Sequence, residues 1–350
     1  MLSVASSKPR PIAVGYVLTH RFLLALLAIQ ALCAVASTAF VFATPASALT
    51  GPLGQLAISV GSAAYAVMAA RLYTLTFVER TPNRSAVLRA EVAGFLADRQ
   101  GLVQGVFTLM LLMGGMFLFA LTKPVVAWAG AFAWDDTLAQ IDRALFLGND
   151  PWRVFHASIG WNWMLTLLTM AYAFWMTLLF STLTIAAFAT GNRIARMQFL
   201  IAHVMTWLLV GVGMATLLSS AGPVYFDRLG LGADFLPLLQ ILDEHAKTYS
   251  YNVRELQEML WRLYQSPQSL SVISAMPSMH VASSLLIALY GFTASRLLGA
   301  VLMGFALCIF VGSVMLGWHY FVDGLVAAAA VAVIWKVSGA LAFRAVGSSD

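Results

Sequence analysis

The stretch AMPSMHVASSLLIALYGFTASRLLGAVLMGFALCIFVGSVMLGWHYFVD (residues 275–323) decides the fold of this chain. It contains two apolar runs, 279–295 and 297–317, separated by a short turn at Arg296. A helix rises 1.5 Å per residue, so each run forms a helix about 30 Å long, which is enough to cross the hydrocarbon of a membrane. The chain therefore enters the membrane and returns, and the residues flanking the two runs are predicted to meet at one face.

The composition is typical of a membrane protein. Hydrophobic residues make up 61% of the 350 residues and charged residues only 10%, whereas soluble domains carry about 25% charged residues. Apolar runs long enough to cross hydrocarbon recur along the whole chain. We therefore predict an all-α polytopic bundle of about eight spans, with these approximate bounds: 22–43, 53–78, 102–122, 161–190, 198–219, 279–295, 297–317 and 319–341.

The first two spans are predicted to form an extension. The first run is too long for the core of a cleaved signal peptide and has no clear cleavage site, so we interpret it as a retained span. A polar, Arg-rich linker from Glu79 to Gln100 follows the second span. We expect two units: residues 1–100, a two-span extension with a cytoplasmic linker, and residues 101–350, a six-span catalytic core.

Charge predicts the orientation of the bundle. Most of the 20 Lys and Arg residues lie at the chain ends, between Arg71 and Arg99, and in the turns at 192–196 and 296, which the positive-inside rule assigns to the cytoplasm. Most of the 15 acidic residues lie in two longer loops, 123–160 and 221–277, on the opposite side. Short loops and this bias suit a bacterial plasma membrane. Because topology accounts for the net charge of +5, we predict no nucleic-acid partner.

The second of these loops is predicted to contain amphipathic helices at the membrane interface. Apolar residues recur in it at helical spacing beside charged residues. The helices can either contact lipid or form a lid on the bundle, and the sequence leaves both open. The apolar positions are Leu236, Leu238, Leu239, Leu242, Leu256, Met259, Leu260 and Leu263.

Ionisable residues interrupt the apolar pattern at both ends of the opening stretch. His280 opens the sixth span, and His319 and Asp323 lie at the junction of the seventh and eighth. Ionisable residues in such places are costly to bury and therefore indicate function. The i, i+4 spacing puts His319 and Asp323 on one helix face if the eighth span begins by about Trp318.

This group of residues suits phosphoryl transfer. Asp323 can hold one ring nitrogen of His319 and orient the other outward, which makes His319 a candidate nucleophile able to form a phosphohistidine. His280 can protonate the leaving oxygen and later activate the acceptor. Ser278 is a candidate N-cap, and the free N–H groups that follow it would attract phosphoryl oxygens. The spacing of His319 and Asp323 also permits two metal ligands, but no third ligand is dictated, so we expect no metal and no other cofactor.

At these residues the sequence resembles the type-2 phosphatidic acid phosphatase superfamily. The likeness rests on Ala275-Met-Pro-Ser-Met-His280 and His319-Tyr-Phe-Val-Asp323, and it is strongest for the branch that contains inositol phosphorylceramide synthases. Ser220-Ala-Gly-Pro-Val-Tyr225 also looks like a Pro/aromatic segment of that branch. The resemblance covers about the six-span core and implies a metal-independent double displacement, in which His319 attacks, Asp323 supports it and His280 serves as acid and then base.

The sequence departs from the phosphatase pattern at several positions. Met279 stands where the phosphatases have Gly, and Gly312-Ser313 replaces the expected Ser-Arg, so one phosphate-binding Arg is missing. Lys247 and Arg254 have the family's Lys-to-Arg spacing, although Glu255 follows where Pro is expected. We retain these two as candidate phosphate ligands.

Other basic residues and a candidate lid remain open in the same loop. Arg228 and Arg262 are alternatives to Lys247 and Arg254, and all four can instead be solvated charges of interfacial helices. Tyr225 is a candidate for a lid over the substrate.

The missing phosphatase-type Arg favours the transferase branch, with membrane lipids as substrates and no obligatory protein partner. We therefore expect an inositolphosphotransferase-like enzyme that works on the extracytoplasmic side. A lipid phosphate phosphatase is the first alternative, because the two reactions differ chiefly in whether water attacks the intermediate. A transporter or flippase is the second, although transporter sites usually lie at broken helices near the membrane midplane.

Overall fold

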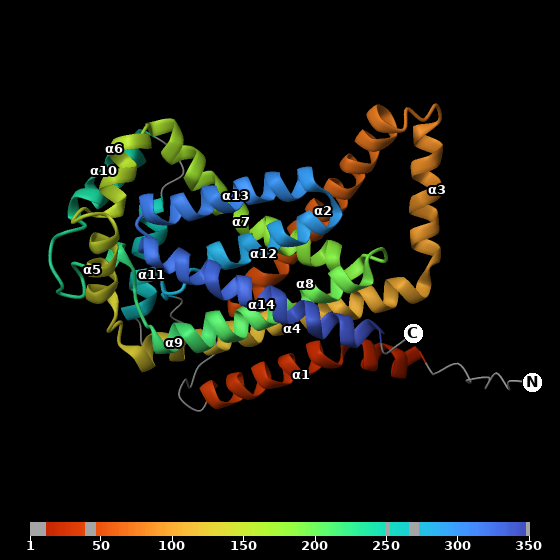
Figure 1. Ribbon diagram of the computed structural model, residues 1–350, viewed down its shortest axis with the longest axis horizontal. Coiled ribbons are helices and arrows are strands. Elements are labelled where there is room, and N and C mark those ends of the chain that lie inside the picture. Colours follow the sequence, from red (N-terminus) through yellow and green to blue (C-terminus); the bar gives the residue numbers. More distant parts are fainter. Residues whose placement is uncertain (1–11, 39–46, 249–252, 266–272, 348–350) are drawn as a thin grey trace, which may run out of the picture.

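The computed structural model describes residues 12–38, 47–248, 253–265 and 273–347, and within these ranges it contains helices and no strands (Figure 1). The predicted all-α class is therefore confirmed for the described part of the chain. The α-helices are α1 (Ile12–Thr38), α2 (Ser47–Tyr73), α3 (Arg84–Ala97), α4 (Arg99–Gly130), α5 (Asp135–Leu145), α6 (Pro151–Ile159), α7 (Asn162–Phe188), α8 (Arg193–Met205), α9 (Ala215–Leu217), α10 (Leu236–Thr248), α11 (Val253–Gln265), α12 (Met279–Ala294), α13 (Arg296–Met315) and α14 (Phe321–Gly347). Shorter pieces are the π-helices η1 (Thr74–Val78) and η2 (Thr206–Met214) and the 3-10 helix η3 (Pro223–Tyr225).

Each predicted span overlaps a helical segment, although residues 39–43 of the first span lie outside the described residues. Six of the segments in the described ranges are long and apolar enough to cross a membrane. These six indicate an integral membrane protein; they are Gly15–Ser37, Arg99–Lys123, Asn162–Phe188, Arg193–Leu217, Arg296–Met315 and Phe321–Gly347. The sixth predicted span, α12, is apolar but only 16 residues long, or about 24 Å, so it is shorter than the hydrocarbon layer. That α2 and α12 also cross the membrane stays a prediction.

Helix boundaries and some connecting segments differ from those expected. α1 begins ten residues before the predicted start of the first span, at Ile12. Much of the predicted linker after Glu79 is helical, since α3 lies within it, and the predicted loop 123–160 contains α5 and α6. Helices of this kind are missed because their sequences lack the length and apolarity of a span. The two predicted helices of the second loop are present as α10 and α11.

One hydrophobic core joins the first helix to the spans that follow. Leu23 and Leu27 of α1 are buried in the same cluster as Leu112 of α4, Leu183 of α7 and Ile287 of α12. α12 and α13 form an antiparallel hairpin, which packs against α7 and α14. Whether residues 1–100 form a unit of their own remains a prediction, but α1 is packed into the bundle.

The short helices gather at the two ends of the bundle. Figure 1 shows α5, α6, α10 and α11 at one end, on the left, and α3 running across the opposite end. α12 and α14 both begin at the end that carries α5, α6, α10 and α11. The chain segments around His280 and His319 therefore lie beneath these short helices.

Candidate active site

Two histidines from the ends of the α12–α13 hairpin lie next to each other. His280 is the second residue of α12, and His319 lies in the turn between α13 and α14. Their ring centroids are 5.8 Å apart, with an angle of 66° between the rings. At this separation two imidazoles can act on one phosphorus atom from different sides.

The segments that carry the two histidines are also joined through the backbone. The Ser278 N–H donates to the carbonyl oxygen of Asp323 across 3.3 Å. Ser278 is the N-cap of α12, as expected, and its hydroxyl accepts the Val281 N–H at 3.4 Å. The beginning of α12 is therefore fixed beside the beginning of α14, and a role of Ser278 in binding phosphate stays a prediction.

His319 precedes α14 instead of lying on it. The shared helix face depended on α14 beginning by about Trp318, and that condition is not met, because α14 begins at Phe321. Gly317 has a φ of +72° and turns the chain, and the His319 N–H donates to the carbonyl of Ser313 at 3.0 Å. The turn holds the imidazole in place before the helix starts.

Asp323 nevertheless reaches His319. Its Oδ2 lies 3.3 Å from Nδ1 of His319 and accepts the backbone N–H of Tyr320 at 3.0 Å. The second contact is the half of a capping box in which a side chain of the first turn reaches back to the N-cap N–H. The carboxylate therefore folds back toward the imidazole, as the spacing predicted, although the two residues do not share a helix.

The pair is buried and incompletely hydrogen-bonded. His319 is 4% exposed and Asp323 is fully buried. The 3.3 Å separation is an ion-pair distance without hydrogen-bond geometry, and neither His319 Nδ1 nor Asp323 Oδ1 has a hydrogen-bond partner among the described residues. Such buried polar atoms are few in folded proteins and mark strained or functional places.

Aromatic side chains surround the His280 ring. Tyr172 stacks on it with centroids 4.7 Å apart, and the Trp175 ring lies at 4.1 Å. The indole N–H of Trp175 donates to the hydroxyl of Ser283 at 2.9 Å, which fixes the indole. His280 therefore has an apolar wall from α7 on the side that does not face His319.

Asp142 of α5 holds the start of α14. Its two carboxylate oxygens accept the backbone N–H groups of Phe321 (2.7 Å) and Val322 (2.9 Å). These N–H groups have no partner within the helix, and a carboxylate at this end also meets the positive pole of the helix dipole. Burial raises the pKa of Asp142 to about 7, against the effect of the two N–H donors, and the charges of Asp323 and Asp150 act in the same direction as burial.

Asp135, at the start of α5, connects the turn before α14 to a second loop. It accepts the hydroxyl of Tyr320 at 2.9 Å, the hydroxyl of Ser220 at 3.0 Å and two backbone N–H groups, of Ala221 and Gly222, at 2.8 Å. Burial raises the pKa of Asp135 even though these donors oppose the shift. Since Tyr320 follows His319 directly, Asp135 helps to position the turn that carries His319.

The loop at 220–225 passes very close to this turn. Gly222 has a φ of +100°, and a Cβ added there would lie 2.5 Å from the carbonyl oxygen of Trp318. The N–H of Val224 donates to the carbonyl of Gly317 at 3.0 Å. Only glycine fits at position 222, because a side chain would meet backbone and also strain φ.

Helix α11 is attached to the same turn through Gln257. The fully buried side chain of Gln257 donates to the carbonyl of Leu316 at 2.9 Å, and the backbone carbonyl of Gln257 accepts the hydroxyl of Tyr225 at 2.9 Å. Tyr225 is 2% exposed and stacks on Trp261. The candidate lid residue therefore contacts α11, and contact with a substrate stays a prediction.

A comparison with protein-family models finds a match to the PAP2 superfamily over residues 136–337, more than half of the chain. The chain belongs to the PAP2 superfamily. Members of this superfamily are phosphatases and phosphotransferases that act on phosphate esters. Comparisons with curated proteins and with solved structures found no match.

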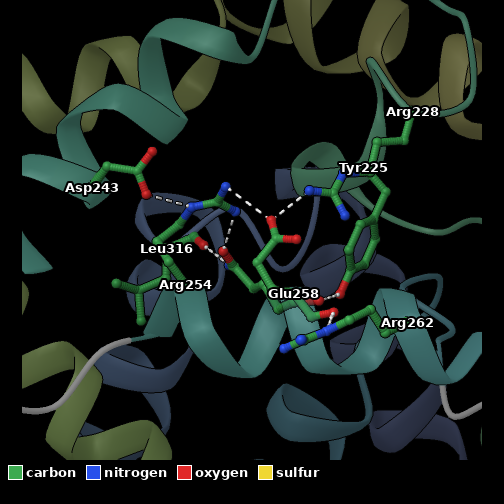
Figure 2. Close-up of polar contacts among 8 residues, drawn as sticks. Tyr225, Arg228, Asp243, Arg254, Glu258, Arg262 and Leu316 are labelled. Carbon is green, nitrogen blue, oxygen red and sulfur yellow. Dashed lines mark hydrogen bonds and ion pairs between the residues drawn. The ribbon is translucent and has the colours of Figure 1, made fainter.

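The two basic residues suggested by the family spacing, Lys247 and Arg254, form ion pairs with carboxylates. Lys247 is 69% exposed at its side chain and pairs with Glu244 at 2.6 Å. Arg254 pairs with Asp243 at 2.9 Å and with Glu258 at 3.3 Å (Figure 2). These carboxylates already neutralise the two cations, and the role of Lys247 and Arg254 as phosphate ligands stays a prediction.

The two alternative arginines lie in the same region. Arg228 pairs with Glu258, and Arg262 donates to the backbone carbonyl of Glu258 at 3.4 Å. Glu258 thus joins three guanidinium groups, as Figure 2 shows. In this structure the network ties α11 to the loop that carries Tyr225.

Several residues near the two histidines could not be identified from the sequence as part of a site. Asp135 and Asp142 stood out only as acidic residues of a loop, and Tyr172 and Trp175 only as aromatic residues of an apolar span. Lys123 followed the third predicted span directly, where a lysine is ordinary. What distinguishes each of these side chains is its burial, which arises only when segments distant in the sequence pack together. Within the described ranges no group of three or more His, Cys, Asp or Glu residues is arranged to hold a metal ion.

Proposed function

We propose that this protein is a lipid phosphotransferase of the inositol phosphorylceramide synthase-like type, which moves a phosphoryl-bearing head group from one lipid to another through a phosphohistidine. The observation that supports this most strongly is the pair of imidazoles with centroids 5.8 Å apart, one of them 3.3 Å from a buried carboxylate, in a PAP2-superfamily chain. Hydrophobic spans around the pair suit a lipid substrate.

The first half-reaction forms a bond between His319 and phosphorus. Because Nδ1 of His319 faces Asp323, Nε2 is the nitrogen whose lone pair attacks. The bond between phosphorus and the leaving oxygen breaks, and that oxygen takes a proton from His280. Asp323 stabilises the positive charge that develops on the His319 ring.

The second half-reaction reverses these roles. His280, now neutral, takes the proton of the acceptor hydroxyl while the acceptor oxygen attacks phosphorus and the P–N bond breaks. An alcohol as acceptor gives a new phospholipid, and water gives hydrolysis. The aromatic wall of Tyr172 and Trp175 and the attached helix α11 support transfer, because both reduce the access of water.

A lipid phosphate phosphatase of the same superfamily is the alternative. The family match is equally compatible with it, because the match does not separate the two activities. Charge distribution supports a site on the extracytoplasmic side of a plasma membrane, with both termini in the cytoplasm, because acidic loops adjoin the histidines and most basic residues lie elsewhere.

The test is a product analysis with purified protein in detergent. One sample receives labelled phosphatidic acid, and another receives labelled phosphatidylinositol with ceramide. A new phospholipid supports transfer, free phosphate supports the phosphatase, and His319→Ala should abolish either one. Lipid flux across a bilayer that survives His319→Ala, without phosphate chemistry, would instead indicate a transporter. Substantial turnover by His319→Ala would remove the phosphohistidine from the proposal.

A further inference from the structure

Lys123 is a buried cation near the end of α4. Only 9% of its surface is exposed, and its ammonium lies 5.5 Å from the centroid of the Phe119 ring. None of the ion pairs formed by the described residues includes it. A lysine at the end of a span normally extends its ammonium into water, so burial without a carboxylate is unusual.

The position of Lys123 relates it to the histidine pair. Phe119, which lies beneath the ammonium, flanks Gly211 together with Met279: a Cβ on that glycine would meet the Phe119 ring at 2.8 Å and the Met279 sulfur at 3.2 Å. Met279 is the residue before His280, and Lys123 is close enough to His280 for the two groups to interact electrostatically. Lys123 therefore approaches His280 from α4, whereas the aromatic wall approaches it from α7.

An uncompensated cation is costly to bury, and an anion that enters the site removes that cost. The proposed reaction at the histidine pair places a phosphate group, which is an anion, at this position. A fixed ammonium would also stabilise the negative charge on the transferring phosphoryl oxygens.

We propose that Lys123 binds the phosphoryl oxygens of the substrate beside His280 and His319, and so supplies the site's phosphate-binding cation from α4, outside the segment that matches the family model. This inference rests on the proposed function. It assigns to Lys123 the role that the sequence suggested for Lys247 and Arg254.

The experiment measures inhibition by orthovanadate, which mimics the phosphoryl group during transfer. Purified wild type, Lys123→Met and Lys123→Arg are compared. Loss of a charge-assisted hydrogen bond should weaken vanadate inhibition by roughly 10- to 100-fold in Lys123→Met. Lys123→Arg keeps the charge and should recover most of the affinity. Lys336→Met, which changes an exposed lysine of α14, is the matched control and should behave as wild type.

The outcomes separate this inference from the proposed function. If wild type turns over phosphate esters and Lys123→Met binds vanadate within about twofold of wild type, the role of Lys123 is refuted while the proposed function stands. If wild type neither turns over phosphate esters nor binds vanadate, both are refuted. Loss in Lys123→Met that Lys123→Arg restores supports the inference.

A second measurement covers the case in which Lys123→Met does not fold. Wild type is treated with a lysine-specific label, with and without vanadate, and labelling is followed by mass spectrometry. Vanadate should reduce labelling of Lys123 at least severalfold and leave Lys247 and Lys336 unchanged. Protection of Lys247 instead of Lys123, or of neither lysine, would overturn the proposal.

Discussion

At the scale of single residues, the site combines groups whose chemistry the sequence suggested with groups that only hold them in place. His280, His319 and Asp323 are close together, and Asp135 and Asp142 fix the backbone that carries two of them. Buried carboxylates of the second kind cost free energy unless donors satisfy them. Here backbone N–H groups and hydroxyls do so, which makes these aspartates positioning residues.

His280→Ala should lower turnover by roughly 10²- to 10⁴-fold, the range expected for loss of general acid catalysis. The loss should be larger for substrates whose leaving group is a poor one, because only those need a proton at the leaving oxygen. The measurement compares kcat on an alkyl phosphate and on an aryl phosphate. Equal losses on both would argue against the acid role.

Asp142 should make stability depend on pH. Its pKa is about 7 in the folded protein and near the ordinary value of 3.8 when unfolded, so folding favours its protonated form. The contribution is fully present below about pH 4 and is lost as pH rises through about 7. In thermal unfolding scans from pH 5 to 8, the melting temperature should therefore fall less steeply with pH in Asp142→Asn than in the wild type.

The control for Asp142 is on the same helix. Asp136 is exposed and bonded only to Gln140 among the contacts described, at 2.8 Å, so Asp136→Asn should keep the wild-type slope. An unchanged slope in Asp142→Asn would show that the carboxyl does not titrate in this range.

At the scale of elements, the start of α14 depends on contacts from three other segments. Asp142 of α5 satisfies its first N–H groups, Asp135 holds Tyr320, and Gln257 of α11 binds the carbonyl of Leu316 just before the turn. α11 also presents Leu256 and Met259, which are 41% and 44% exposed. An exposed apolar face suits a helix at a membrane interface, so α11 can be both an interfacial helix and a lid.

Gln257→Leu should loosen α11 from the catalytic turn. Leucine has a similar volume but cannot donate to Leu316 or accept the guanidinium of Arg254, which now donates to the Gln257 side chain at 2.9 Å. We expect faster amide exchange along α11 and a larger share of product released as free phosphate, because water gains access. Gln265→Leu, at an exposed position of the same helix, should change neither measurement. Unchanged exchange and product ratio in Gln257→Leu would contradict the lid.

At the scale of the whole molecule, the site draws on more of the chain than the family match covers. Residues 136–337 match the PAP2 superfamily, but Lys123 and Asp135 precede that segment. α1 also belongs to the main hydrophobic core. Truncation to the matched segment would remove part of that core together with the cation and a positioning carboxylate.

The proposed chemistry uses two imidazoles and an ammonium, so chelation should not affect it. Purified protein treated with EDTA should keep its full turnover, because no step requires a metal ion to activate water or polarise the phosphate. Activity is measured before chelation, after it, and after adding Mg²⁺ or Zn²⁺. If chelation lowers turnover and added metal restores it, the hypothesis that His319 and Asp323 are metal ligands would be supported again.

The sequence by itself determined the all-α class of the described residues, the approximate positions of the long apolar helices and the meeting of His280 with His319. These follow from local physics: runs of apolar residues set helix length, and an even number of crossings returns the chain to the same face. Spacing also predicted that Asp323 reaches His319, although the helix starts two residues after His319 and not at it. The last turn of a helix and its caps depend on neighbouring segments, so sequence spacing fixes them poorly.

Only the tertiary structure decided which charges are buried and what they contact. Asp142 and Asp136 lie in the same short helix, yet one caps α14 and the other faces outward. Lys123 and Lys247 were both lysines beside the predicted loops, yet one is buried near His280 and the other pairs with Glu244 at the surface. The physical reason is that burial of a charge depends on segments far away in the sequence, which no local pattern records.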